Sequence, residues 1–206
     1  MVSMFSLEGK NAAVVGGASG IGEAVATAFA EHGASVLCLD VDIAGALDTA
    51  ATITEMGGEA DAGQLNILDG EAVTAAFESF NVKKGSLDIV VCTPGVNVRK
   101  PILEYTDEDI DRVLGVNLKG NAHVIQAAGR IMTSQGSGSI ILFSSIRSVV
   151  VEPGQSLYAA TKAGIVQMVR TAAAELGPSG VRVNAIAPGV IDTPLTAPIK
   201  DNPAWY

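Results

Sequence analysis

The stretch VVGGASGIGEAVATAFAEHGASVLCLD, residues 14–40, decides the fold class of this chain. An apolar run leads into a glycine-containing turn, a segment of small residues follows, and a second apolar run closes the unit. This order is typical of a strand, a tight turn, a helix and a second strand. Because Gly16, Gly20 and Gly22 lack side chains, the backbone turns tightly and a pyrophosphate can approach the helix N-terminus. The stretch therefore predicts a dinucleotide-binding unit.

Asp40 ends the second predicted strand, 20 residues beyond Gly20. A carboxylate there can accept hydrogen bonds from a ribose 2′-OH and would repel a 2′-phosphate. Neither Ser19 nor Val41 supplies a cation for such a phosphate. The sequence therefore favours NAD over NADP. The alternative is that Asp40 only caps the end of its strand beside Asp42.

Short apolar runs alternate with longer amphipathic segments along the whole chain. Continuous apolar strands are buried on both faces, and their alternation with helices is typical of a parallel sheet with helices on both sides. We therefore predict a single doubly wound α/β domain, with a charged, flexible connector at NVKKGS, residues 81–86. The strands are expected near 12–16, 35–39, 61–65, 88–92, 139–143 and 182–187, and the helices near 20–32, 43–56, 69–80, 107–115, 118–134 and 156–177.

Composition excludes several classes of function. The formal net charge of −9 argues against nucleic acid, because phosphate binding needs a surplus of Lys and Arg. We find no apolar run of about 20 residues and no basic region followed by an apolar block, so neither a membrane span nor a secretory signal is expected. Cys38 and Cys92 lie in predicted strands and are expected to be reduced thiols of a cytoplasmic protein. No cluster resembles a metal site.

A second motif, SLYAATKAG at residues 156–164, places Tyr158 and Lys162 four residues apart, on one face of the last predicted helix. Ser145 follows the strand before it, and Asn117 lies upstream in VNLKG. Together with the glycine turn, this set resembles the short-chain dehydrogenase/reductase family over nearly the whole chain. The resemblance implies a Rossmann-type fold and an oxidoreductase that acts on an alcohol or carbonyl group.

The resemblance also implies roles for these four residues. Tyr158 would be the general acid/base, Ser145 would hold the substrate oxygen, Lys162 would bind the nicotinamide ribose, and Asn117 would anchor a water that passes protons to solvent. A free phenol has a pKa of about 10, which is too high for acid/base catalysis at neutral pH. The Lys162 ammonium and the positively charged ring of the oxidised cofactor are expected to lower the pKa of Tyr158.

Residues 1–95 would mainly bind the cofactor, and residues 96–206 would mainly carry catalysis and the start of the substrate loop. Departures from the family pattern are Val15, where a threonine or serine is usual, and Cys92-Thr93-Pro94-Gly95, where Asn-Asn-Ala-Gly is usual. Asn66 stands where an aspartate commonly contacts adenine. The expected cofactor contacts are Gly16, Ser19, Gly20, Ile21, Gly22, Asp40, Asn66, Ile67, Gly95, Tyr158, Lys162, Pro188, Gly189 and Thr193.

The chain ends at Tyr206, before the substrate-covering helix and seventh strand with which the family continues. We therefore expect a fold without that last helix and strand. Family members commonly pair through helices such as 156–177, so a homo-tetramer or homo-dimer is expected.

The substrate is expected to contact Asn97, Arg147 and Gln155. Cations near the mouth would attract a carboxylate or phosphate, although Arg99 and Lys100 read slightly better as solvated loop charges. These residues favour a polar secondary alcohol or ketone, such as a sugar, sugar acid or hydroxy acid. Two alternatives stay open: a 3-oxoacyl-thioester reductase that uses NADPH, and a non-catalytic nucleotide-binding protein.

Overall fold

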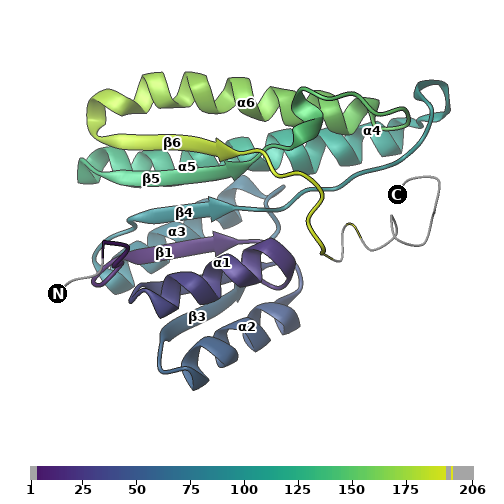
Figure 1. Cartoon of the computed structure of the whole chain (residues 1–206). Coiled ribbons are helices and arrows are strands. Elements are labelled where there is room, and N and C mark those ends of the chain that lie inside the picture. Colours follow the sequence, from purple (N-terminus) through teal and green to yellow (C-terminus); the bar gives the residue numbers. More distant parts are fainter. Residues whose placement is uncertain (1–3, 194–195, 197–206) are drawn as a thin grey trace.

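The computed structural model describes residues 4–193 and 196, and its centre is a six-stranded parallel sheet of order β3-β2-β1-β4-β5-β6 (Figure 1). The strands are β1 (Asn11–Val15), β2 (Ser35–Asp40), β3 (Glu59–Gln64), β4 (Ile89–Cys92), β5 (Gly138–Phe143) and β6 (Val181–Ile186). The main helices are α1 (Gly20–Glu31), α2 (Ile43–Glu55), α3 (Gly70–Lys84), α4 (Asp107–Leu114), α5 (Asn121–Gln135) and α6 (Ser156–Leu176). The doubly wound α/β architecture predicted from the sequence is confirmed.

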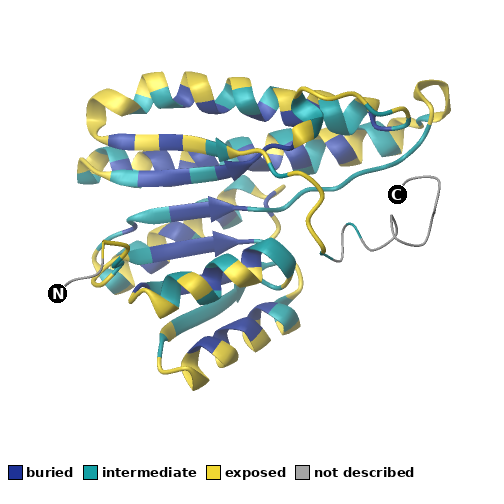
Figure 2. Cartoon of the chain, in the orientation of Figure 1, coloured by how far each residue is buried: buried dark blue, intermediate teal, exposed yellow. Residues whose placement is uncertain are grey.

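Helices cover both faces of the sheet, and each face has its own core. On one face α1 and α2 pack against β1, β2 and β3 around residues such as Val36 and Ile53. On the other face α3, α5 and α6 cover a larger core that includes Phe77, Met132 and Ile165. Figure 2 shows the central strands as almost continuously buried, which agrees with their nearly continuous apolar sequences.

The order of the strands reverses between β1 and β4. β1 pairs with β2 on one side and with β4 on the other. After β1 the chain therefore continues toward β2 and β3, whereas after β4 it continues in the opposite direction, toward β5 and β6. In doubly wound sheets the loops that follow the strands at such a point open a crevice in which ligands bind. Here those loops are the glycine turn after β1 and the segment Thr93-Pro94-Gly95 after β4.

The predicted connector at residues 81–86 is wrong. α3 continues to Lys84, and Gly85 ends it in the left-handed conformation with φ 86°. Lys83 donates to Asp61 of β3 at 2.7 Å, and Lys84 pairs with Glu59 of the same strand. Lysines in the last turn also interact favourably with the helix dipole, so these charges stabilise a helix end beside the sheet edge.

The segment between the two middle helices is not a break either. α4 runs into a π-helical turn at Gly115–Gly120 and then into α5, and the fully buried Asn117 lies inside that turn. π-helical turns are frequent at functional sites. The sequence predicted two separate helices here, 107–115 and 118–134, whereas the structure joins them through this turn.

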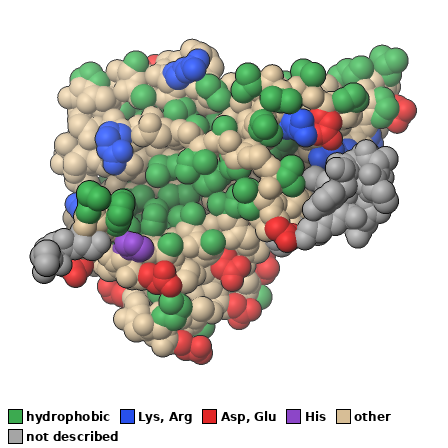
Figure 3. Space-filling model, in the orientation of Figure 1, with side chains coloured by type: hydrophobic (Ala, Val, Ile, Leu, Met, Phe, Trp, Pro, Cys, Tyr) green, Lys and Arg blue, Asp and Glu red, His purple; other side chains and the backbone are tan. Residues whose placement is uncertain are grey.

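β6 forms the edge of the sheet within the described residues, which contain six strands. Figure 3 shows apolar side chains gathered over the part of the sheet that lies between β6 and α1. The helices on this face, α1 and α2, pack against β1, β2 and β3. No helix of the described part of the chain is long and apolar enough to cross a membrane.

Candidate functional site

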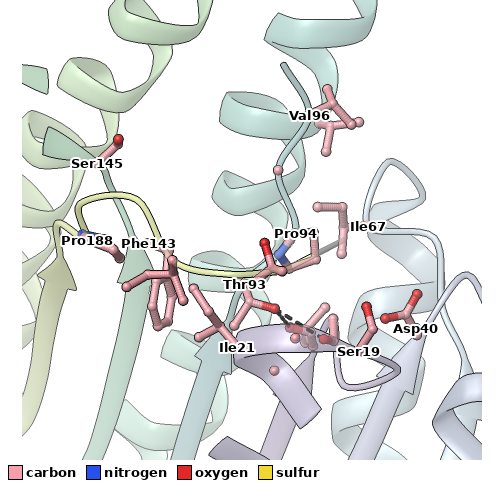
Figure 4. Close-up of a pocket in the computed structure, with 18 of the residues that line it drawn as sticks. Ser19, Ile21, Asp40, Ile67, Thr93, Pro94, Val96, Phe143, Ser145 and Pro188 are labelled. Carbon is pink, nitrogen blue, oxygen red and sulfur yellow. Dashed lines mark hydrogen bonds between the residues drawn. The ribbon is translucent and has the colours of Figure 1, made fainter. Parts of the chain in front are cut away.

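A cleft of about 390 Å³ lies at the carboxyl ends of the strands, along the reversal of strand order. Figure 4 shows Ser19 and Asp40 toward one end of it and Phe143, Ser145 and Pro188 toward the other. All 14 residues predicted to contact the cofactor line this cleft, although their roles stay predictions. Further lining residues, which the sequence did not single out as contacts, include Leu65, Thr93, Pro94, Val96, Val116, Phe143 and Ile191.

The glycine turn has the geometry that an anionic ligand needs. Gly16 has φ 85°, and a Cβ on Gly22 would lie 1.9 Å from the carbonyl oxygen of Gly16. Ser19 is the N-cap of α1, but its side chain makes no capping hydrogen bond. The first backbone N–H groups of a helix have no partner within the helix, and they attract anions. The turn therefore fits the pyrophosphate of a dinucleotide.

Asp40 both supports the glycine turn and faces the cleft. Its Oδ2 accepts a hydrogen bond from the N–H of Ala18 at 3.1 Å, and its Oδ1 accepts from the N–H of Asp42 at 3.1 Å. A carboxylate has about four lone-pair positions, so two further bonds to a ribose diol fit. Of the described residues that line the cleft, Lys162 is the only cation.

Thr93 contributes a support that the sequence did not reveal. Its hydroxyl approaches the carbonyl oxygens of Val15 and Gly16 at 3.1 and 3.2 Å, and so ties the end of β4 to the glycine turn (Figure 4). A Cβ on Gly16 would lie 2.2 Å from this hydroxyl oxygen. The hydroxyl therefore occupies the space behind the turn that only a glycine leaves open.

At the other end of the cleft, α6 brings Tyr158 and Lys162 beside Ser145. The Lys162 ammonium lies 5.5 Å from the centroid of the Tyr158 ring and donates to the carbonyl oxygen of Phe143 at 2.8 Å. Ser145 follows β5, where the Ile146 N–H donates to the carbonyl oxygen of Pro188 at 2.8 Å. The structure therefore brings together three of the four predicted catalytic residues along the wall of the cleft.

The expected lowering of the Tyr158 pKa, which invoked both Lys162 and the ring of the oxidised cofactor, stays a prediction, and the chain alone shows the opposite direction. Burial raises the pKa of the Tyr158 phenol above its ordinary value, and this outweighs the lowering by the hydrogen bond with Ser145 and by the charges of Arg99 and Arg147. Burial also lowers the pKa of Lys162 to about 8. Lys162 stays mostly protonated at neutral pH, yet the pKa of Tyr158 lies above its ordinary value. A lowering of that pKa therefore calls for positive charge that the chain alone does not supply.

Asn117 lies behind this wall rather than on it. Its Oδ1 accepts from the N–H of Val96 at 2.8 Å, and its Nδ2 donates to the carbonyl of Val96 and to the hydroxyl of Thr161. The side chain thus fixes the loop after β4 against α6. Its role in a water-mediated proton path stays a prediction.

The predicted substrate residues lie beside the cleft and not among its lining residues. Asn97 Nδ2 donates to Gln155 Oε1 at 2.8 Å, and Arg147 pairs with Glu152. The interpretation of Arg99 and Lys100 as solvated loop charges is wrong. Arg99 Nη1 lies 2.7 Å from Glu152 Oε1 with its side chain 20% exposed, and Lys100 pairs with Asp109.

Comparison with known proteins agrees with this geometry. The model of a family described as "Enoyl-(Acyl carrier protein) reductase" matches residues 16–206. The chain is also 38% identical over 196 residues to the 3-oxoacyl-[acyl-carrier-protein] reductase of Thermotoga maritima, a match that covers 95% of this chain and 79% of that protein. The chain belongs to the short-chain dehydrogenase/reductase family. It is an NAD(P)-dependent oxidoreductase that acts on CH–OH groups.

Solved structures of other short-chain dehydrogenases/reductases superpose closely. A gluconate 5-dehydrogenase from Burkholderia cenocepacia, in complex with NADP and tartrate, has a TM-score of 0.94 and 30% identity, and the match covers 99% of this chain and 80% of that chain. An NAD⁺-bound xylitol dehydrogenase has a TM-score of 0.86 and 32% identity, with 91% of this chain and 72% of that chain covered. Members with either cofactor thus share this fold.

Proposed function

We propose that this enzyme transfers hydride between NAD(H) and a polar secondary alcohol or ketone, of the sugar, sugar acid or hydroxy acid type. The proposal rests on the common cleft: Asp40 lies toward one end of it, and Ser145, Tyr158 and Lys162 line the other. Similarity to a gluconate 5-dehydrogenase and a xylitol dehydrogenase supports this substrate type. When bound, NAD supplies the hydride acceptor.

In this proposal the three residues of the wall, and Asn117 behind it, divide the work. Tyr158 takes the proton of the alcohol, or returns it to the carbonyl oxygen. Ser145 donates a hydrogen bond to the substrate oxygen as charge develops on it. Lys162 holds the nicotinamide ribose and, with the positive charge of the oxidised ring, lowers the pKa of Tyr158. Asn117 keeps the loop after β4 in place and anchors a water for proton exchange.

The preference for NAD follows from charge. Asp40 would repel a 2′-phosphate, and no described lining residue near it is a cation. We expect NAD⁺ to bind at least about ten-fold more tightly than NADP⁺, and Asp40→Ala to remove most of this difference. Asp42→Ala is the control, because Asp42 caps α2 and does not line the cleft. Equal affinities of the wild type in calorimetric titrations would contradict the assignment.

A second candidate is a 3-oxoacyl-thioester reductase that uses NADPH. The similarity to the Thermotoga maritima reductase favours it, as do the exposed side chains of Val149 and Val151, 83% and 90% exposed on the loop after Ser145. Turnover of acetoacetyl-CoA with NADPH but not with NADH would select this candidate over the first. We infer in addition that the chain acts in the cytoplasm and forms a homo-oligomer; the apolar area in Figure 3 supports the second of these inferences.

A further inference from the structure

Three loops bring together a compact cluster of charged side chains, and the charges of its two arginines act on the phenol of Tyr158. Arg99 comes from the loop after β4, Arg147 from the turn that follows Ser145, and Glu152 from the loop before α6. Arg99 Nη1 contacts Glu152 Oε1 at 2.7 Å, and Arg147 Nη2 contacts Glu152 Oε2. One carboxylate therefore serves two guanidinium groups, with one oxygen for each.

The cluster is charged and only partly exposed. The side chains of Arg99, Arg147 and Glu152 are 20%, 22% and 23% exposed. Burial opposes the ionisation of Glu152, yet Arg99, Gln155 and Arg147 together hold its pKa below the ordinary value. The positive charges of both arginines also favour the phenolate of Tyr158 and so oppose the rise in its pKa. The cluster thus influences the group that is proposed to transfer the proton.

Arg147 has the donors that an acid group needs. A guanidinium carries five N–H donors in a planar fork that matches a carboxylate, and the contact with Glu152 is made through Nη2. Arg147 lies two residues from Ser145, and its backbone N–H donates to the Ser145 hydroxyl oxygen at 3.2 Å. This bond fixes the backbone of Arg147 relative to the residue proposed to hold the reacting oxygen, while Glu152 holds its guanidinium.

We propose that Arg147 binds an anionic group of the substrate, and that Glu152 holds its guanidinium in position. The substrate is then a hydroxy acid, and its product an oxo acid, rather than a neutral polyol. This inference rests on the proposed hydride transfer and selects among its substrates. A charge-assisted hydrogen bond distinguishes a carboxylate from the carboxamide of the same shape, so we expect about a ten- to one-hundred-fold preference for the acid.

The experiment compares kcat/KM for matched acids and amides: D-gluconate with D-gluconamide, 3-hydroxybutyrate with 3-hydroxybutyramide, and lactate with lactamide. Formation of NADH is followed with the wild type, Arg147→Gln, Arg147→Lys and the control Arg170→Gln, whose residue lies exposed on α6. Arg147→Gln should remove the difference in kcat/KM between the best acid and its amide. The readout is the ratio of the two values, because loss of the Arg147 charge, which also acts on Tyr158, affects both rates alike. Arg147→Lys should retain part of the preference, because it keeps the charge without the fork. Arg170→Gln should behave as the wild type.

Two results separate this inference from the proposed function. Turnover of acids and amides at equal rates, or an acid preference that survives Arg147→Gln, refutes the role of Arg147 and leaves hydride transfer intact. Failure of the wild type to bind NAD⁺ in calorimetry refutes the proposed function and this role with it. Titration of each variant with NAD⁺ also checks folding, because the dinucleotide cleft is built largely from other residues.

Discussion

Lys162 should make the native chain less stable at neutral pH than at alkaline pH. Its side chain is 3% exposed, and burial lowers its pKa from 10.5 to about 8. Between these two values the unfolded chain binds more protons than the native chain, so the free energy of unfolding rises with pH. This difference in pKa lowers the free energy of unfolding by about 3 kcal/mol. The loss of stability is present in full below about pH 8 and disappears by about pH 10.5.

The test is Lys162→Met, which keeps an unbranched side chain and removes the titrating amine. Relative to this variant, the wild type should gain about 2.5 kcal/mol of unfolding free energy between about pH 7 and pH 10. The variant also loses the 2.8 Å hydrogen bond from Lys162 to the Phe143 carbonyl. Because a neutral amine still donates this bond, its loss lowers the stability of the variant by nearly the same amount at every pH and leaves the change with pH almost unaffected. Urea denaturation at several pH values measures the difference. Both chains should carry Tyr158→Phe, so that the phenol does not titrate in the same range.

Parallel stability profiles of the two chains would refute this reasoning, because they would mean that Lys162 titrates in the native chain as it does in the unfolded one. A steeper rise in the variant than in the wild type would reverse the sign of the argument. The expected result would instead show that the proposed catalytic lysine is retained against a measurable loss of stability, as is common for active-site residues.

Three further substitutions test the cleft. Tyr158→Phe should lower kcat by about 10²–10⁴-fold and change NAD⁺ affinity little in calorimetry, because it removes one proton donor and keeps the ring. Gly22→Ala should abolish measurable NAD⁺ binding, since its Cβ would lie 1.9 Å from the Gly16 carbonyl oxygen, whereas Gly177→Ala, where a Cβ meets nothing within 4 Å, should bind normally. Thr93→Val should raise the Kd for NAD⁺ by about ten-fold through loss of its hydrogen bonds, and Thr93→Ser should restore it; an unchanged Kd in Thr93→Val would exclude this support.

The strands were predictable because the sheet is buried on both faces. β1, β2, β4 and β5 are nearly continuous apolar runs, so their sequences differ clearly from the amphipathic helices between them. β3 is the least buried strand, with no residue in the buried class, and its predicted range was displaced by about two residues for that reason. The position of Tyr158 and Lys162 on one wall of the cleft was predictable from their fixed spacing on one helix.

Long-range charge pairing was the part that the sequence could not supply. The end of α3 looked like a loop because Lys83 and Lys84 are polar, yet both find acidic partners on β3, more than 20 residues away. Glu152 likewise joins Arg99 and Arg147 from three separate loops. Local pattern reports which residues are charged, whereas the fold decides which of those charges face each other.

The departures at positions 15 and 93 are best understood together. Val15 lacks the hydroxyl that is usual before the first glycine, and Thr93 stands where the family usually has asparagine. In the structure Val15 is 1% exposed and packs in the core, while the Thr93 hydroxyl reaches across from β4 to the carbonyl oxygens of Val15 and Gly16. A hydroxyl absent from one strand is therefore supplied by its neighbour. Each substitution alone weakens the expected pattern, but as a pair they leave one hydroxyl between the two strands, and it ties the glycine turn to the end of β4 at the edge of the crevice in which a dinucleotide binds.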